Sequence, residues 1–191
     1  FDPVEGAEAV EAKGLVALPG AVDSHVHFHM PTANGGYNAD DFSTGSTCAV
    51  CGGTTTVVDF ASPVEGESWT EGVRRRRAEA DGLVFCDYGL HMEVTGAFRQ
   101  DITRLNELAD AGVRVLKIYT TYGADQYPGE KLPALFAEAK RLNLRILAHC
   151  ENDEIIQETK RRMLAAGRTD ASMHAKSRPA VAEIAAVREL I

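Results

Sequence analysis

Short apolar runs alternate with amphipathic runs along most of the chain, and this alternation restricts the possible folds more than any other feature. The short runs are rich in β-branched or apolar residues and often follow Gly or Asn, which is typical of strands. They cover residues 21–28, 53–60, 84–94, 113–120 and 144–150. The runs between and after them predict helices over residues 40–51, 67–81, 99–111, 130–142, 152–167 and 179–190.

Strands that alternate with helices predict a parallel sheet covered by helices. An open doubly wound sheet and a closed (β/α)8 barrel both fit this pattern. The sequence contains neither G-x-G-x-x-G nor G-x-x-x-x-G-K-[ST], which removes the usual nucleotide-binding reasons for the open sheet. Polar residues instead fall near the ends of successive strands, where barrel active sites are built. We therefore expect an α/β fold of the TIM-barrel type, with only about the first five β/α units present.

Single residues predict where several of the helices begin and end. Asp40 and Ser68 are suitable N-terminal caps, because their side chains can accept hydrogen bonds from free backbone N–H groups. Gly82, Gly112 and Gly167 are suitable C-terminal stops, because glycine adopts the left-handed backbone that often ends a helix.

The charge balance limits the partners of the chain. The formal net charge is -8, and nucleic acids and anionic membranes both favour basic surfaces, so we expect neither as a partner. The only basic run, residues 74–77, is expected to form a solvated helical face. No apolar stretch approaches the ~20 residues that span a bilayer, and we recognise no signal peptide.

The four cysteines predict no disulfide framework, which favours a cytoplasmic location. Cys48 and Cys51 form a C-x-x-C pair, a spacing that can serve redox chemistry or zinc binding. No second pair completes a tetrahedral zinc site, and buried cysteine behaves as a small hydrophobe. We expect both to pack on one face of a helix, with a metal or redox role as the alternative.

Three of the six histidines stand at alternate positions in one short run, "DSHVHFHMP". Residues two apart in a strand point to the same side, so His25, His27 and His29 share a face if the strand continues to residue 29. Imidazole nitrogens bind zinc and similar divalent ions well. A His-x-His pair at a strand end therefore predicts a metal site, with satisfied core histidines as the alternative.

Lys117 and His149 lie in two later strand-like runs, "VRVLKIYT" and "LRILAHC". Burial among apolar neighbours lowers the pKa of a lysine, and a neutral lysine can react with carbon dioxide to give a carbamate that bridges two metal ions. The alternative is a lysine that reaches the strand end or pairs with a carboxylate. On spacing alone His149 fits a ligand or a structural residue equally well. We expect His91 to be structural, and the sequence assigns no role to His174.

Several motifs together resemble those of the cyclic amidohydrolases, most closely the hydantoinase/dihydropyrimidinase branch. They follow one another in the order and spacing of that family and cover the chain from about Gly14 to its end. The motifs are LVALPGAVDSHVHFHMP, DDFSTGSTCAVCGGTTTVVDF, DYGLHMEVTG, VLKIYTTYG, LAHCENDEII and HAKSRP.

The resemblance implies a metal-dependent hydrolase that opens a hydantoin or dihydropyrimidine ring, a small cyclic amide, with a metal-bound hydroxide. It matches His25, His27 and His149 to metal ligands and Lys117 to a carboxylated lysine that bridges two divalent ions, with zinc as the expected metal. It matches Tyr122 to a catalytic and substrate-binding phenol that donates a hydrogen bond to the developing oxyanion. Two cations that share a water make hydroxide available at neutral pH, which supports these roles.

His29 does not fall on a ligand position of the family, and we expect it to line the pocket. Dihydroorotases have an arginine there, which this chain lacks, so the resemblance favours the hydantoinase branch. Allantoinase or dihydroorotase chemistry on the same site is an alternative. A non-catalytic scaffold related to dihydropyrimidinase is another.

The family also uses a histidine and an aspartate from later strands, and neither is in this sequence. The chain starts at Phe1 and ends at Ile191 inside a helical pattern, so we expect it to be part of a longer protein. Residues 1–14 are expected to be a remnant of an N-terminal β-domain and linker, and residues 15–191 the first part of the barrel. The remaining barrel segment would come from the same or another chain. The resemblance further implies a homo-oligomer, a tetramer in the family.

Overall fold

The computed structural model describes residues 5–32, 35–62, 64–97 and 101–191, and these contain one sheet of five parallel strands. The strands are β1 (Ala21–Asp23), β2 (Thr54–Ala61), β3 (Asp87–Glu93), β4 (Val115–Tyr119) and β5 (Arg145–His149). Each strand pairs with the one before it in the sequence, from β1 at one edge to β5 at the other. The order does not reverse as it does in a doubly wound sheet, so the predicted partial barrel is confirmed.

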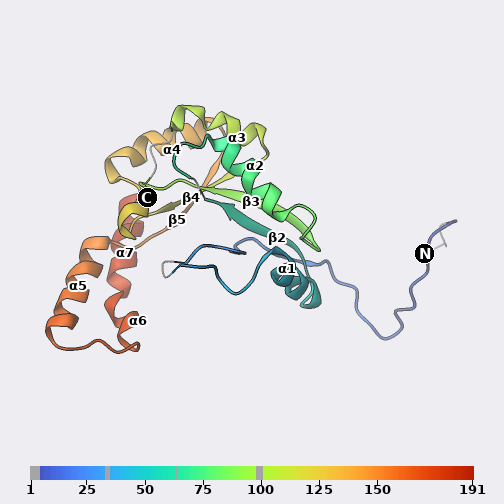
Figure 1. The fold of residues 1–191 in the computed structure, drawn as a ribbon, viewed down its shortest axis with the longest axis horizontal. Coiled ribbons are helices and arrows are strands. Elements are labelled where there is room, and N and C mark those ends of the chain that lie inside the picture. Colours follow the sequence, from blue (N-terminus) through green and yellow to red (C-terminus); the bar gives the residue numbers. More distant parts are fainter. Residues whose placement is uncertain (1–4, 33–34, 63, 98–100) are drawn as a thin grey trace.

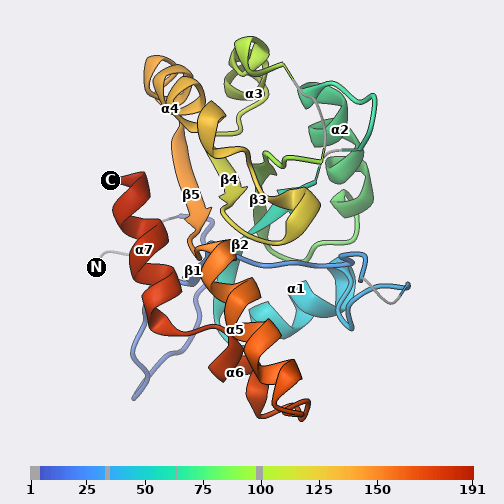
Figure 2. The ribbon, with the colours of Figure 1, turned by 90° about the vertical axis from the view of Figure 1, so that its left-hand side faces the viewer.

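Helices occupy the segments between the strands and after β5 (Figure 1). They are α1 (Phe42–Cys51), α2 (Trp69–Ala80), α3 (Asn106–Asp110), α4 (Leu132–Arg141), α5 (Asp153–Ala165), α6 (Met173–Ser177) and α7 (Ala180–Leu190). Three short 3-10 turns cover Ile102–Arg104, Gly123–Asp125 and Gly129–Lys131. Figure 2 shows α7 beside β5, and α5 and α6 below the carboxyl end of that strand.

The two faces of the sheet differ in chemistry because side chains alternate along each strand. Met92, Leu116 and Ile118 are fully buried on one face, in a core shared with residues of α2, α3 and α4. Their neighbours Glu93 and Lys117 are register partners and lie on the other face. Apolar packing is therefore on the helix-covered face, and the polar groups of β3 and β4 are on the inner face.

Several predicted element boundaries are wrong. The strand expected over 21–28 ends at Asp23, and the helix expected over 40–51 begins at Phe42, capped by Asp41 instead of Asp40. The helix expected over 99–111 is a 3-10 turn followed by the five-residue α3. Its first two residues, 99–100, lie outside the described part of the chain.

Other boundary predictions are confirmed. Ser68 caps α2 in a reciprocal arrangement with Glu71, whose side chain accepts from the Ser68 N–H at 2.8 Å. Gly82, Gly112 and Gly167 follow α2, α3 and α5 and have left-handed backbone, with φ of 82°, 82° and 68°.

The cysteine and arginine predictions need correction. Cys48 and Cys51 are exposed, because α1 packs through Phe42, Gly45 and Ser46 on its other face. In the basic run, Arg74 and Arg77 are exposed as expected, but residue 76 is buried. Four consecutive residues cover slightly more than one helical turn, so at least one of them points toward the sheet against which the helix packs.

Residues 5–20 are exposed and enter no helix or strand before β1 (Figure 1). Within the described ranges, the helices are too short and too polar for any of them to cross a bilayer.

Candidate functional site

The first two histidines of the alternating run follow β1 and lie together. Beyond Asp23 the backbone leaves the regular ladder but stays beside β2, since the Val26 N–H donates to the Val58 carbonyl at 3.0 Å. The rings of His25 and His27 have centroids 5.1 Å apart, and each lies 4.6 Å from the Phe60 ring. An extended segment thus places both imidazoles on one aromatic platform without a continuous strand.

His29 does not share this arrangement. Its backbone has φ of 45°, in the left-handed region, and its ring stacks on Tyr37 with centroids 3.8 Å apart. The three histidines would share one face only if the strand continued to residue 29. Because β1 ends six residues earlier, His29 is not held on that face by a strand. His27, His29 and Tyr37 line one cavity of about 350 Å³, which Asp59 and Arg76 also line.

Lys117 lies at the middle of β4, on the inner face of the sheet. It is 7% exposed, and its register partners are Glu93 on β3 and Leu147 on β5. Burial lowers the pKa of its amine, and the Glu93 carboxylate partly opposes this. Burial also lowers the pKa of His25, and the charge of Lys117 lowers it further. The lysine and the first histidine are therefore electrostatic neighbours, and both are biased toward the neutral form that binds metal.

His149 ends β5 and is held through one ring nitrogen. Its Nε2 lies 2.6 Å from a Glu151 carboxylate oxygen and 3.0 Å from the Tyr122 hydroxyl. The Arg178 Nε donates to both Glu151 oxygens, at 2.9 and 3.0 Å. Arg178 therefore holds the pKa of Glu151 below its usual range, with a smaller contribution from His149. An ionised carboxylate beside Nε2 is the partner that commonly orients a metal-binding histidine.

Tyr122 lies at the same strand end in a strained conformation. Its φ of 78° is left-handed, which is rare for a large side chain and is concentrated at functional sites. The side chain is 45% exposed, and the Arg178 guanidinium lies 5.0 Å from its ring centroid. A half-exposed phenol beside a cation can donate a hydrogen bond to a small molecule that enters from the inner face.

His91 lies beside the first two histidines, with its ring centroid 5.2 Å from that of Phe60. The His91 ring is buried on β3, and its Nε2 lies 3.1 Å from the Ser24 carbonyl, so it ties β3 to the segment after β1. His174 lies in α6, a short helix outside the ranges in which the sequence predicts helices.

Sequence reasoning missed two polar groups that support the site. Tyr119 donates to Glu93 at 2.6 Å on the inner face, next to Lys117. Glu151 and Arg178 hold His149. Strand parity could have identified Glu93 and Tyr119, since both lie two residues from an inner-face residue. No local pattern could pair Arg178 with a residue 27 positions earlier.

The donor set is suited to divalent metal ions. It contains imidazoles, which bind such ions well, and a buried lysine whose lowered pKa suits conversion to a carbamate. Among the described residues, no three His, Cys, Asp or Glu side chains are grouped closely enough to hold an ion by themselves.

Comparisons with known proteins identify the family of the chain and its relatives. Residues 16–185 match the model of the Amidohydrolase family. The chain is 35% identical to a dihydropyrimidinase from Rattus norvegicus over its whole length, and 36% identical over 95% of its length to a D-hydantoinase from Streptomyces coelicolor. It spans only 37% and 39% of these two relatives.

The fold of the chain is also similar to those of solved structures. A crystal structure of a D-hydantoinase superposes with a TM-score of 0.89 at 31% identity, over 98% of this chain and 41% of that one. A dihydropyrimidinase from Brevibacillus agri gives 0.88 at 32% identity, over 97% and 41%.

Proposed function

Because this chain belongs to the amidohydrolase family, we propose that the protein containing it hydrolyses a cyclic amide, opening a hydantoin or dihydropyrimidine ring. The relatives named as dihydropyrimidinase and D-hydantoinase support this substrate class. The observation that carries the proposal is the buried Lys117, whose lowered pKa and position near His25 suit a bridging ligand. Since the chain covers 37% of the rat relative, the activity is proposed for the whole protein.

Four residues of this chain would hold two divalent ions, for which zinc is our choice. They are His25, His27, His149 and a carboxylated Lys117. The chemistry that such a pair of ions supplies is a water of lowered pKa and a polarised ring carbonyl. The family match and the donor set support this assignment.

Lys117 would become a ligand through a reaction of its own amine. The neutral Nζ attacks the carbon of carbon dioxide, a C–N bond forms, and one amine proton leaves to solvent. The product is a carbamate anion with two oxygens. Burial supports this step because it favours the neutral amine, which is the reactive form.

His149 would bind through Nδ1. Its Nε2–H is positioned to donate to Glu151, and Arg178 fixes that carboxylate from the other side. Such outer partners fix the tautomer and orientation of a ligating histidine. Tyr122 would donate its hydroxyl hydrogen to the carbonyl oxygen as negative charge develops there, a contribution of about 3 kcal/mol for one such donor.

The test is hydrolysis by the full-length protein supplied with zinc. We expect ring opening of a hydantoin or of dihydrouracil, with Lys117→Ala losing both activity and bound zinc and partly recovering them with short carboxylic acids. If only allantoin or dihydroorotate is hydrolysed, the protein has the alternative activity, that of an allantoinase or a dihydroorotase. No turnover on any of these rings, together with no stoichiometric zinc, would indicate a non-catalytic scaffold and overturn the proposal.

The remaining expectations concern the whole protein. We propose that residues 1–14 belong to an N-terminal β-domain and linker and that residues 15–191 form the first part of the barrel. The family match, which begins at residue 16, supports this division. We further propose a homo-oligomer, a tetramer as in the family, and a cytoplasmic location, which the four free cysteines support.

A further inference from the structure

The backbone from His27 to Met30 is fixed by side chains from three other parts of the chain. The Asn38 amide donates to the His27 carbonyl, and its oxygen accepts from the Met30 N–H at 2.7 Å. Asp59 accepts from the Phe28 N–H at 3.2 Å, and Arg76 donates to the Phe28 carbonyl. The residue directly after a proposed metal ligand is thus held at both of its backbone polar groups by one acid and one base.

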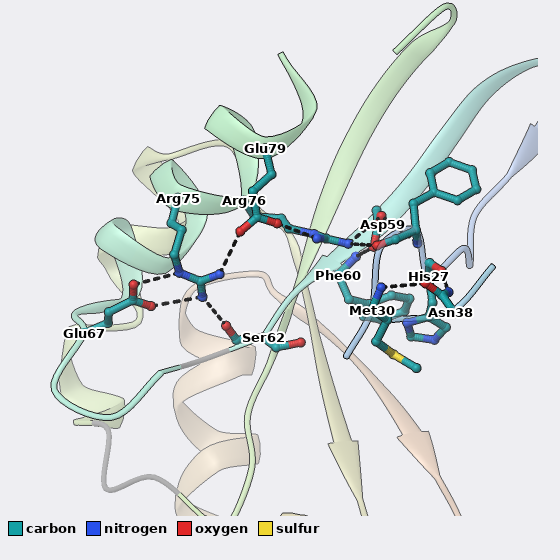
Figure 3. Close-up of polar contacts among 11 residues, drawn as sticks. His27, Met30, Asn38, Asp59, Phe60, Ser62, Glu67, Arg75, Arg76 and Glu79 are labelled. Atoms are coloured by element: carbon teal, nitrogen blue, oxygen red, sulfur yellow. Dashed lines mark hydrogen bonds and ion pairs between the residues drawn. The ribbon is translucent and has the colours of Figure 1, made fainter. Parts of the chain in front are cut away.

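Asp59 and Arg76 form a buried ion pair between β2 and α2 (Figure 3). The two residues are 1% and 6% exposed, and the Arg76 Nη2 lies 3.0 Å from an Asp59 carboxylate oxygen. The Arg76 Nη1 also donates to Glu79 at 2.6 Å, and the guanidinium carbon lies 4.5 Å from the Phe42 ring centroid. The charges on the pair are therefore fixed in position from several sides.

A buried ion pair is a poor source of stability. Removing two charges from water costs several kcal/mol per ion, and well-packed apolar residues of similar volume are often equally or more stable. Burial raises the pKa of Asp59, and the charge of Arg76 only partly opposes this. Such a pair fits a role in geometry better than a role in stability.

We propose that Asp59 and Arg76 are positioning residues that set the orientation of His27 toward the metal. This inference rests on the proposed function. Asp59 accepts from the Phe28 N–H, and Arg76 donates to the Phe28 carbonyl. The peptide that follows His27 therefore cannot rotate without breaking a charged hydrogen bond. Metal ligation tolerates only small errors in ligand position, which gives this constraint a consequence for the site.

The neighbouring Arg75 provides a matched control. It carries the same charge on the same helix but turns toward Glu67, with its Nε 2.8 Å from a Glu67 carboxylate oxygen (Figure 3). It also donates to Glu79 at 3.2 Å and to the Ser62 carbonyl at 2.8 Å. Among the described residues, Arg75 forms no hydrogen bond or ion pair with the segment from His27 to Met30. Loss of Arg75 therefore removes an ion pair of α2 and leaves the histidine segment held.

The experiment measures zinc affinity by chelator competition in the folded full-length protein, well below its unfolding temperature. We expect Asp59→Asn and Arg76→Lys to weaken zinc binding about 10- to 100-fold, the usual effect of losing an outer support of a ligand. We expect Arg75→Gln to change it less than twofold. Zinc affinity, and not KM, is the deciding measurement, because Asp59, Arg75 and Arg76 all line the cavity that His27 and His29 line.

The outcomes separate the two proposals. If the unsubstituted protein binds zinc and all three variants bind it equally well, the pair is structural and the positioning inference is wrong. If the unsubstituted protein binds no zinc, the proposed function fails and the inference fails with it. Arg76→Lys keeps the charge and most of the volume, so it provides the decisive measurement if Asp59→Asn does not fold.

Discussion

Lys117 shows how chemistry and stability conflict at a single residue. A charged amine that is 7% exposed has lost most of its hydration, and Glu93 only partly compensates, since the net effect is a lowered pKa. In the unfolded chain the same amine titrates near its ordinary value of 10.5. At pH values between the lowered pKa of the folded protein and the ordinary pKa of the unfolded chain, only the unfolded chain has this amine protonated. In that range the free energy of unfolding therefore rises with pH.

The first prediction removes this ammonium. Lys117→Met should make the metal-free protein about 1 kcal/mol more stable at pH 7, because an apolar chain replaces a poorly solvated charge. It should also abolish the extra rise in stability of the unsubstituted protein as pH approaches 10.5 from below. Urea unfolding at several pH values, in buffer free of carbon dioxide, measures both effects. Lower stability of the variant at pH 7 would mean that Glu93 already compensates the charge.

Single residues also show the limits of prediction from sequence. His25, His27, Lys117 and His149 were selected by strand position and by a family resemblance, and all of them occur near the carboxyl ends or on the inner face of the sheet. The buried Arg76 could not be selected from four consecutive arginines. Which arginine turns inward depends on Asp59 lying opposite, and that contact is made only in the folded chain.

At the scale of elements, close contact between α1 and the histidine segment accounts for part of the site geometry. The Phe28 ring is buried against α1, with its centroid 5.9 Å from the Phe42 ring. A β-carbon at Gly45 would lie 2.2 Å from a ring carbon of Phe28. Glycine is therefore required at this point of α1 to let the helix approach the loop.

The second prediction tests that approach. Gly45→Ala should destabilise the protein by about 2 kcal/mol, because overpacking outweighs the gain of up to ~1 kcal/mol in helix propensity. Gly72→Ala in α2 is the control, since its β-carbon would meet only ordinary contacts at 3.5 and 3.6 Å. It should be neutral or stabilising. Thermal unfolding of both variants compares the sites, and equal effects would contradict the close-contact explanation.

The main error at this scale concerns β1, and its cause is local hydrogen bonding. The sequence predicts a strand over 21–28, but the Asp23 side chain accepts the His25 N–H at 3.1 Å and Asp59 accepts the Phe28 N–H. Carboxylates take donors that a regular ladder would use. Apolar alternation identifies the extended segment correctly, but it cannot show that side chains replace backbone partners there.

At the scale of the whole molecule, the number and order of the strands could be predicted from the sequence. Each β/α unit has its own sequence pattern, and consecutive units are usually neighbours in the sheet. The candidate site is different, since its groups come from β4 and β5, from the segments after β1 and β4, and from Arg178 beyond α6. Their relative positions depend on contacts between segments far apart in the sequence, which no local pattern shows. In the described chain β1 and β5 are the unpaired edges of the sheet.

The last prediction follows from these edges. A parallel sheet is normally covered on both faces, and an unpaired strand is a template for another chain. Residues 1–191 produced alone should therefore associate at micromolar concentration, with Leu147 exposed by 37% on the inner face of the edge strand β5. Light scattering measures this, and co-expression with the rest of the natural protein should suppress it. Leu147→Lys should reduce association, because a charge on an edge strand opposes pairing with another chain. A stable monomer that binds no hydrophobic dye would show that the half-barrel is self-sufficient and that its inner face needs no completing segment.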